Sequence, residues 1–299
     1  MTTSSGLLLI DKPGGLTSHD VVASVRKILN EKKVGHAGTL DPMATGLLVL
    51  AVGPSTRLLR FAQSERKHYT GAVSFGVATD SLDADGTVIG DGQIPTTSSE
   101  EINEVAQTMT GAQRQTPPMV SALKVGGKRL YELARQGVEV ERSPRDITVN
   151  RFTLGPTEDR AVWIFDVECS VGTYVRVLLS DLASRLGTVA HLVALRRIES
   201  GAHHVKDAVS LEQLARNVDE GVGVLRPPLD FVAALEHVQL TNDEERKARM
   251  GQRLTLPGSL VGPEIAALSA SGELIGVLRR RNETWQPQLV LAASDDVRG

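Results

Sequence analysis

Apolar residues recur along the chain with two different spacings. Residues 7–10 form a continuous apolar run of strand length, which ends in a turn rich in proline and glycine. We predict that Ser18 then caps a helix. Apolar residues follow it at helical spacing, namely Val21, Val22, Val25, Ile28 and Leu29. The spacing stops at residues 34–46, and an apolar strand is predicted at residues 47–52.

The middle of the chain mixes strand and helix patterns. Residues 69–77 alternate between apolar and polar positions, which predicts a half-buried strand. Ser98 and Glu101 form a capping-box pattern for a helix that we expect to end near Gly111. A strand is predicted over residues 162–169. The helix after it has an apolar face of Val175, Leu178, Leu179, Leu182 and Leu186. Because no regular βαβ rhythm connects these elements, the predicted fold class is α+β.

A segment with two prolines at residues 226–229 marks the expected boundary between two domains. We expect a larger domain over residues 1–230. A small, mostly β domain is expected over residues 236–299, where short apolar runs such as residues 273–278 occur. Neither part contains an internal repeat or a low-complexity tract.

Composition argues against several functional classes. No apolar run in the 299 residues approaches the length of a membrane span, and the N-terminus lacks the segments of an export signal. The single cysteine, Cys169, rules out an internal disulfide framework and a cysteine-built zinc site, so we expect a cytoplasmic protein. The segment from Ser81 looks like a calcium loop, but Gly92 at its twelfth position offers no side-chain ligand. We predict a turn between strands there, and no metal site.

Charge is distributed unevenly along a chain whose formal net charge is −3. Residues 77–105 contain many acidic residues and no lysine or arginine. Basic residues gather in a later stretch, at Lys124, Lys128, Arg129, Arg135, Arg142, Arg145 and Arg151. This segregation allows one basic face that follows the phosphates of a nucleic acid. Two solvated faces of opposite sign are the more ordinary interpretation.

Asp41 stands in a glycine-rich loop directly before Pro42. Proline disfavours helical geometry at the preceding residue, so Asp41 is expected on extended backbone that a ligand can approach. Arg176 falls in the first turn of a predicted helix, where the macrodipole disfavours a cation. A carboxylate bound there would explain the arginine, and the pair would keep a nucleophilic aspartate ionised. A turn aspartate and a surface arginine are the alternatives.

The three tyrosines are further candidates. Tyr69 begins a predicted strand, Tyr131 lies in the basic stretch and Tyr174 precedes Arg176 by two residues. A phenol ring can stack on an extruded base and also offers a hydroxyl. Core packing is the usual role of a tyrosine, and sequence position does not overturn it.

The segment over residues 35–46, Gly-His-Ala-Gly-Thr-Leu-Asp-Pro-Met-Ala-Thr-Gly, resembles the catalytic loop of the tRNA pseudouridine synthase B family. Further segments resemble that family in the same order, at residues 9–18, 67–69, 79–86, 117–124, 172–176 and 195–197. The resemblance covers about residues 7–205. It implies a bent, mostly antiparallel mixed sheet flanked by helices, with a central cleft. The C-terminal segment resembles the RNA-binding PUA module.

The resemblance also implies an activity, the isomerisation of uridine 55 in the T loop of tRNA to pseudouridine. Asp41 would be the nucleophile, Arg176 its partner, and Tyr69 the ring that stacks on the flipped base. The residues implied to line the pocket or support the flipped loop are His36, Tyr174 and Leu195. The stretch over residues 117–145 resembles an RNA-gripping insertion, with Lys124, Lys128, Arg129 and Arg135 as contacts. The implied enzyme is a monomer that binds the tRNA elbow and needs no cofactor or metal.

Two other functions remain open at this point. A noncatalytic tRNA-binding or folding module would keep the cleft without the reaction. A glycoside hydrolase would need a second carboxylate opposite Asp41 as acid or base. The product distinguishes the three functions, since they would yield pseudouridine, no modified base or free uracil.

Overall fold

The computed structural model describes residues 5–63, 66–121, 124–125, 128–129, 138 and 140–291. Within this part of the chain a long sheet runs in the order β1-β3-β12-β4-β11-β10-β7, with β2 beside β3 and β13 beside β12. Its strand pairs are antiparallel except for β12 with β3. The strands are β1 (Gly6–Lys12), β2 (Val34–His36), β3 (Thr45–Val52), β4 (Lys67–Phe75), β7 (Gly111–Gln115), β10 (Arg145–Pro156), β11 (Val162–Cys169), β12 (Ala190–Ser200) and β13 (His203–His204).

A second, four-stranded sheet follows near the C-terminus in the order β14-β15-β16-β17. Its strands are β14 (Glu236–Gln239), β15 (Glu264–Leu268), β16 (Leu274–Arg281) and β17 (Thr284–Val290). Two short hairpins stand outside both sheets, β5 (Val77–Thr79) with β6 (Val88–Asp91) and β8 (Lys124–Val125) with β9 (Lys128–Arg129). A mostly antiparallel sheet with flanking helices and a β-rich C-terminal part confirms the predicted α+β fold class.

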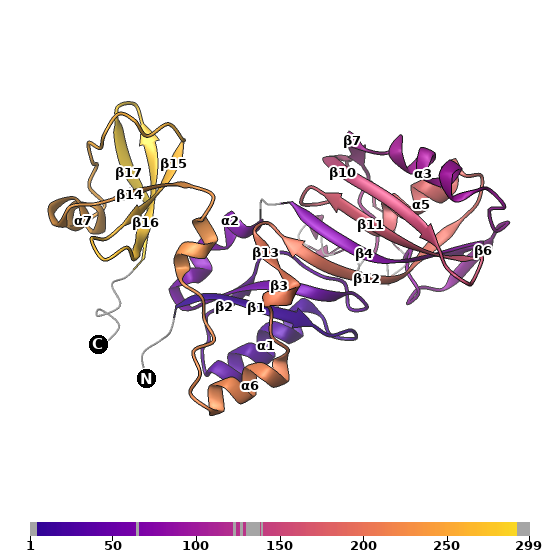
Figure 1. Cartoon of the computed structure of the whole chain (residues 1–299), viewed down its shortest axis with the longest axis horizontal. Coiled ribbons are helices and arrows are strands. Elements are labelled where there is room, and N and C mark those ends of the chain that lie inside the picture. The colour runs from indigo at the N-terminus through magenta and orange to yellow at the C-terminus, as the bar shows by residue number, and fades with distance from the viewer. Residues whose placement is uncertain are drawn as a thin grey trace.

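Helices cover opposite ends of the long sheet (Figure 1). α1 and α6 lie together beside β1, β2 and β3, whereas α3 packs on β10 and α5 on β12. The helices are α1 (Ser18–Leu29), α2 (Leu59–Gln63), α3 (Ser99–Gln107), α5 (Val175–Arg185), α6 (Leu211–Asp219) and α7 (Asn242–Arg249), with short 3-10 helices at η1 (Gly53–Leu58), η2 (Val205–Asp207) and η3 (Pro228–Val232). None of the helices in the described ranges is long and apolar enough to cross a membrane.

Residues 7–10 of β1 and residues 47–52 of β3 are all apolar because both faces of these strands are covered. Leu8 and Leu50 face a cluster that includes apolar residues of α1 and α6. Leu7 and Leu47 face a second cluster, to which Ala266 of the C-terminal sheet also belongs. A strand covered on both sides has no solvent face, so its sequence does not alternate. β11, with one face toward solvent, does alternate between buried and partly exposed positions.

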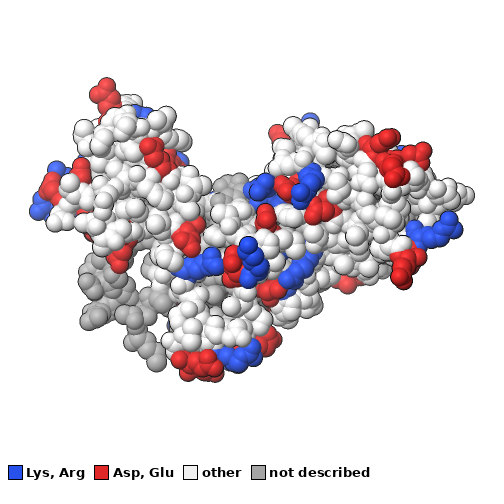
Figure 2. Space-filling view, in the orientation of Figure 1, with Lys and Arg blue, Asp and Glu red and all other residues white. Residues whose placement is uncertain are grey.

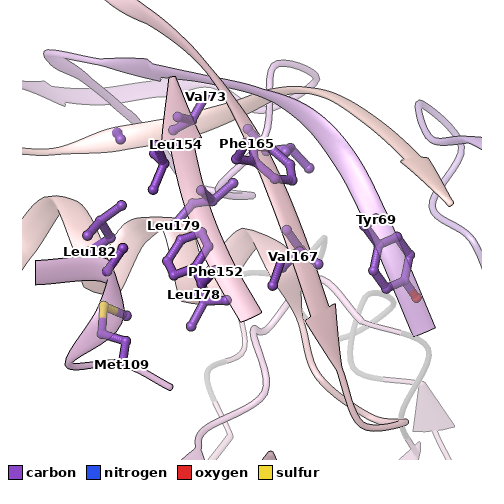
Figure 3. Packing of buried hydrophobic residues seen from close by; sticks show 14 of the residues in the cluster. Tyr69, Val73, Met109, Phe152, Leu154, Phe165, Val167, Leu178, Leu179 and Leu182 are labelled. Atoms are coloured by element: carbon purple, nitrogen blue, oxygen red, sulfur yellow. The ribbon is translucent and has the colours of Figure 1, made fainter. Parts of the chain in front are cut away.

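A third cluster fills the space between α3, α5 and strands β4, β10 and β11 (Figure 3). Phe152, Phe165 and Leu179 lie within it. Tyr69 lies at the edge of this cluster on β4, with its hydroxyl directed away from the other labelled side chains. The Tyr69 ring therefore packs against the apolar cluster, and its hydroxyl points away from that cluster.

The cap of α1 differs from the prediction by one residue. Thr17, not Ser18, is the N-cap: its side chain accepts a bond from the Asp20 N–H, and the Asp20 carboxylate accepts one from the Thr17 N–H. Both hydroxyl residues suit a cap. The backbone decides between them, because Thr17 has the extended conformation that a cap requires (φ −73°, ψ 158°). Ser18 is buried as the first helical residue.

The capping box at the start of α3 is confirmed, since Ser98 and Glu101 exchange both of the expected bonds. The helix ends at Gln107, earlier than expected. Gly111 adopts a positive φ of 91° and begins β7. Glycine adopts a positive φ both after the end of a helix and at the start of a strand. The sequence pattern did not distinguish the two cases, so it placed the end of α3 too late.

Candidate active site

The loop between β2 and β3 carries Asp41 and ends where two backbones meet closely. Gly46 lies at the start of β3, paired in parallel with Arg197 of β12. A Cβ atom at Gly46 would lie 2.3 Å from the Arg197 carbonyl oxygen, and the residue has a φ of 98°. Only glycine meets both conditions. The end of the loop is therefore tied to the middle of the long sheet.

Side chains from the N-terminal segment hold the middle of this loop. The Ser18 hydroxyl accepts a bond from the Leu40 N–H at 2.9 Å and donates to the Leu40 carbonyl at 3.2 Å. The buried Lys12 ammonium donates to three carbonyls at 2.6 to 3.1 Å, one of which belongs to Pro42. Asp41 thus stands between two anchored neighbours, and its position is set by the fold.

Arg176 approaches the same loop from the first turn of α5. Its side chain is only 3% exposed, and its Nε lies 3.0 Å from Oδ2 of Asp41. Its Nη1 lies 3.2 Å from Oδ2 of Asp83. The remaining guanidinium bonds go to the carbonyls of Ser81, at 2.7 Å, and Val120, at 3.1 Å. Two carboxylates therefore offset the cation that the start of a helix disfavours.

Asp83 is buried in the turn that the sequence predicted between β5 and β6. Its Oδ1 accepts bonds from the Ser81 hydroxyl at 2.5 Å and the Asp85 N–H at 3.2 Å, which leaves Oδ2 for Arg176. Leu82 has a left-handed conformation, with φ 64°. The turn was predicted correctly but without a function. Its buried carboxylate is a second partner for the arginine that holds Asp41.

The Asp41 and Arg176 side chains line a cleft of about 370 Å³. Its lining includes Asp41, Tyr69, Tyr174, Arg176 and Leu195, which the sequence had suggested from separate segments. Other described residues around it include Gly38, Thr39, Lys67, Ser121, Thr173 and Arg197. The fold thus gathers the nucleophile loop, β4, β12 and the start of α5 around one hollow.

Tyr174 is held in place through its backbone. It is the N-cap residue of α5, where it makes no side-chain capping bond. The Gln115 side chain bonds to both polar groups of its backbone, accepting from the N–H at 2.7 Å and donating to the carbonyl at 3.1 Å. The phenol is therefore free of any capping role and lines the cleft.

Two groups of predicted residues are not part of this described cleft. His36 lies on β2, outside the lining residues, and its ring centroid is 5.5 Å from that of His19. The side chains of Lys124, Lys128 and Arg129, and all of Arg135, fall outside the described residues, as does Tyr131. The RNA-gripping role of this stretch stays a prediction.

Comparison with known proteins identifies the family. The profile described as TruB family pseudouridylate synthase (N terminal domain) matches residues 26–175, and the tRNA pseudouridylate synthase B C-terminal domain matches residues 176–227. The chain is 42% identical over 289 residues to a tRNA pseudouridine synthase B of Leifsonia xyli subsp. xyli, covering 93% of this chain and 94% of the relative. The chain belongs to the TruB family of pseudouridylate synthases. It is thus an enzyme, an isomerase.

Further relatives agree with this assignment. A tRNA pseudouridine synthase B of Lactobacillus gasseri is 37% identical over 298 residues, which cover 97% of this chain and 99% of the relative. Among solved structures, a chain of a Cbf5-Nop10-Gar1 complex superposes with a TM-score of 0.76 at 24% identity, over 99% of this chain and 88% of that one. An archaeal box H/ACA sRNP Nop10-Cbf5 complex gives 0.73 at 21% identity, over 100% and 89%. These two structures support the fold.

The electrostatic setting of Asp41 balances opposing effects. Burial raises the pKa of its carboxyl, the Arg176 guanidinium opposes that rise, and the Asp83 carboxylate adds to it. Burial lowers the pKa of Lys12 to about 8, against the attraction of Asp41. Because a guanidinium stays protonated, Arg176 works at every physiological pH against the neutralisation of Asp41 that burial favours.

The cleft contains one carboxylate among its described lining residues, that of Asp41. Asp83 contacts Nη1 of Arg176, whereas Asp41 contacts Nε, and Asp83 is not among the described residues that line the cleft. The pair of opposed carboxylates that a glycoside hydrolase uses is missing from this part of the structure. In the described ranges, no group of three or more potential ligand residues could hold a metal ion.

Sequence reasoning missed three buried residues around the nucleophile loop, Lys12, Asp83 and Arg197. Lys12 is the last residue of β1, directly after the apolar run, and Arg197 lies within β12. A charged residue in a buried strand is a usable signal, because such residues are rarely buried without a partner. Only the fold shows which partner each one has.

Proposed function

We propose that this protein isomerises uridine 55 in the T loop of tRNA to pseudouridine, with Asp41 as the nucleophile. One observation carries the proposal: the Asp41 carboxylate, bonded at 3.0 Å to a buried guanidinium, opens onto a cleft beside Tyr69. Membership of the family supports the reaction, and the relatives, which are tRNA pseudouridine synthases B, support tRNA as the substrate. A noncatalytic module would not need a charged nucleophile held in this way.

The reaction begins when the target uridine leaves its stack and enters the cleft. Asp41 attacks either the uracil ring or the anomeric carbon of the ribose. The bond between N1 and C1′ breaks, the ring turns, and a bond forms between C5 and C1′ as Asp41 is released. The C5 proton is lost and N1 gains one. The atoms of substrate and product are the same, so the step needs no cofactor.

The other cleft residues bind and orient the flipped nucleotide. Tyr69 stacks on the uracil and assists the removal of the C5 proton, since its side chain lines the same cleft as Asp41. Tyr174 and Leu195 contact the nucleotide from α5 and β12, and His36 supports the flipped RNA loop next to the cleft. Phosphate contacts from the stretch over residues 117–145 complete the binding site, through Lys124, Lys128, Arg129 and Arg135.

The proposal includes the wider setting of the reaction. The T-arm and elbow of tRNA are the partner, and the enzyme acts as a monomer in the cytoplasm. Residues 1–230 form the catalytic domain and residues 236–299 a PUA-like domain. Along the chain, β13 (His203–His204) is the last strand of the long sheet, and β14, which starts at Glu236, is the first strand of the C-terminal sheet. This order supports the division.

The direct test is pseudouridine formation in unmodified tRNA transcripts, mapped by chemical modification and primer extension. Asp41→Asn keeps the size of the side chain and removes the nucleophile. We expect the single-turnover rate to fall by at least about 10⁴-fold, as for loss of other enzymatic nucleophiles. Binding of tRNA should stay within about twofold, because phosphate contacts dominate such affinities.

Asp181→Asn is the matched control, since it removes an exposed carboxylate from the same helix that carries Arg176. It should react like the wild type. A normal rate in Asp41→Asn would refute the nucleophile. If the wild type binds tRNA and forms no pseudouridine, the noncatalytic module is the correct function, and mapping of the modified position tests the choice of uridine 55.

A further inference from the structure

Arg197 occupies the point where the two halves of the cleft meet. It lies on β12, directly opposite Tyr69 of β4 on one side and Gly46 of β3 on the other. Its side chain is only 2% exposed, which makes it one of the largest fully buried side chains of the protein. It also contributes to the lining of the cleft. One strand position thus borders both the phenol and the nucleophile loop.

The guanidinium of Arg197 bonds to two loop carbonyls that precede Asp41 and to one carbonyl of β3, the strand that follows the loop. Nη2 donates to the Gly38 carbonyl at 3.2 Å, and Nη1 lies 3.4 Å from the Thr39 carbonyl. Nε donates to the Leu47 carbonyl at 2.7 Å, beyond the loop. One rigid, planar group therefore sets the span between the two ends of the loop.

No carboxylate pairs with Arg197 among the described residues. The ion pairs in this part of the chain leave it out, whereas Arg176 has two carboxylate partners. Backbone carbonyls neutralise a buried guanidinium only in part, so a position without a counter-ion is costly. A neutral donor could hold the same carbonyls at lower cost. The charge itself therefore calls for an explanation.

The Tyr69 phenol is the other group that this charge faces. Burial raises the pKa of Tyr69, and the Arg197 guanidinium opposes that rise by its attraction for the ionised phenol. The two residues are cross-strand neighbours, which agrees with this interaction. The charge of Arg197 is thus exerted on the side of the cleft where the base would stack.

We propose that Arg197 is a positioning residue that fixes the nucleophile loop and the Tyr69 phenol relative to each other, and that its unpaired charge favours the negative charge that develops on uracil. The inference rests on the proposed function. Whether Asp41 adds to the ring or displaces N1 from C1′, the electron pair moves onto the uracil ring. A fixed cation beside that ring lowers the barrier without any movement of its own.

Three variants test the proposal. Arg197→Met removes the charge at similar length, Arg197→Lys keeps the charge without the planar fork, and Arg196→Lys changes the neighbouring arginine. Arg196 pairs with Asp11 at 2.7 and 3.0 Å and does not line the cleft, which makes it the matched control. Single-turnover rate, tRNA affinity and the urea midpoint are measured for each variant.

We expect Arg197→Met to lose on the order of 10³-fold in rate, as when a fixed donor at a developing charge is removed. The rate of Arg197→Lys should be about tenfold higher than that of Arg197→Met, because lysine keeps the charge but not the bidentate geometry. Affinity for tRNA should stay within about twofold for both, since the phosphate contacts are elsewhere. Equal rates in Arg197→Met and Arg197→Lys, or a rate in Arg197→Met as high as in Arg196→Lys, would overturn the proposal.

A double-mutant cycle with Tyr69→Phe separates positioning from general stability. If Arg197 acts through the phenol, the loss in Tyr69→Phe/Arg197→Lys should be smaller than the product of the two single losses. Multiplicative losses would contradict this action. The cycle uses the lysine variant, so it remains decisive if Arg197→Met fails to fold. Absence of pseudouridine in the wild type is a separate result, which would refute the proposed function itself.

Discussion

The two walls of the cleft hold Asp41 by different kinds of bond. On the wall formed by the nucleophile loop, Lys12, Ser18 and Arg197 bond to backbone groups. On the wall formed by the start of α5, Arg176 bonds to two carboxylates, those of Asp41 and of Asp83 in the turn after β5. The first wall therefore fixes the loop that carries Asp41, and the second controls the charge of its carboxylate and orients it.

Because the two walls use different bonds, the position of the nucleophile loop and the ionisation of Asp41 can be controlled separately. Backbone bonds restrain a loop whatever the protonation state of its carboxylate. Charge pairs change the pKa values of the groups they join, and one added carboxylate changes the balance. The surface of the protein does not show this arrangement: acidic and basic residues are interspersed over the visible face (Figure 2). Substitutions on each wall should accordingly change different measurements.

Among three further substitutions around Asp41, the largest effect on the rate is expected at Asp83, on the wall that controls charge. Asp83→Asn removes a carboxylate that raises the pKa of Asp41, so the pKa of Asp41 falls. Activity should therefore persist to lower pH than in the wild type. The rate at neutral pH should drop on the order of 10²-fold, because the guanidinium that orients Asp41 loses a partner. Single-turnover rates from pH 4 to 9 measure both effects.

Asp85→Asn is the control for this profile, since Asp85 is exposed in the same turn. It should leave the profile unchanged. The rate of Asp83→Asn should fall off at a lower pH than the wild-type rate does. If the fall on the acid side of the profile stays at the same pH or moves to higher pH, the electrostatic role of Asp83 is contradicted. The comparison between the walls would then lose its basis.

An intermediate effect is expected at Lys12, on the wall that controls position. Its pKa is lowered from 10.5 to about 8, so the folded protein releases this proton before the unfolded chain does. Stability that involves Lys12 is therefore lowest below about pH 8 and is gained as the pH rises to about 10.5. The unfolding free energy of the wild type should rise relative to Lys12→Met over this range, by at most about 1.4 kcal/mol per pH unit.

Urea titrations at several pH values measure this difference. Lys27→Met removes an exposed lysine from α1 without touching the loop and serves as the control for net charge. A constant difference between wild type and Lys12→Met from pH 8 to 10.5 would show that the ammonium is not buried as the structure has it.

The smallest effect separates two neighbouring hydroxyl residues. Thr17→Ala removes the cap of α1 and should cost about 1 kcal/mol of stability, with no change in rate. Ser18→Ala removes both bonds to Leu40 and should cost about as much stability. It should also slow the reaction, because the loop loses an anchor. Equal rates in the two variants would show that Ser18 does not restrain the nucleophile.

Local patterns were sufficient for several features. The capping box of Ser98 and Glu101 is a short-range signal, and it is confirmed. The cation at the start of α5 broke a helix rule, which pointed to a buried anion near Arg176. The glycines and proline around Asp41 predicted a loop. Each of these inferences depends on residues within a few positions of one another, so chain geometry alone supports them.

Other features depended on which distant segments meet. The sequence shows a turn at Asp83, but not that its carboxylate reaches a guanidinium in α5, far along the chain. It shows an arginine in β12, but not that the strand passes between Tyr69 and Gly46. The family, the nucleophile candidate and most helices and strands follow from the amino-acid sequence. Which buried charges face one another follows from the three-dimensional fold, because a charge acts over a few ångströms in space whatever its separation along the chain.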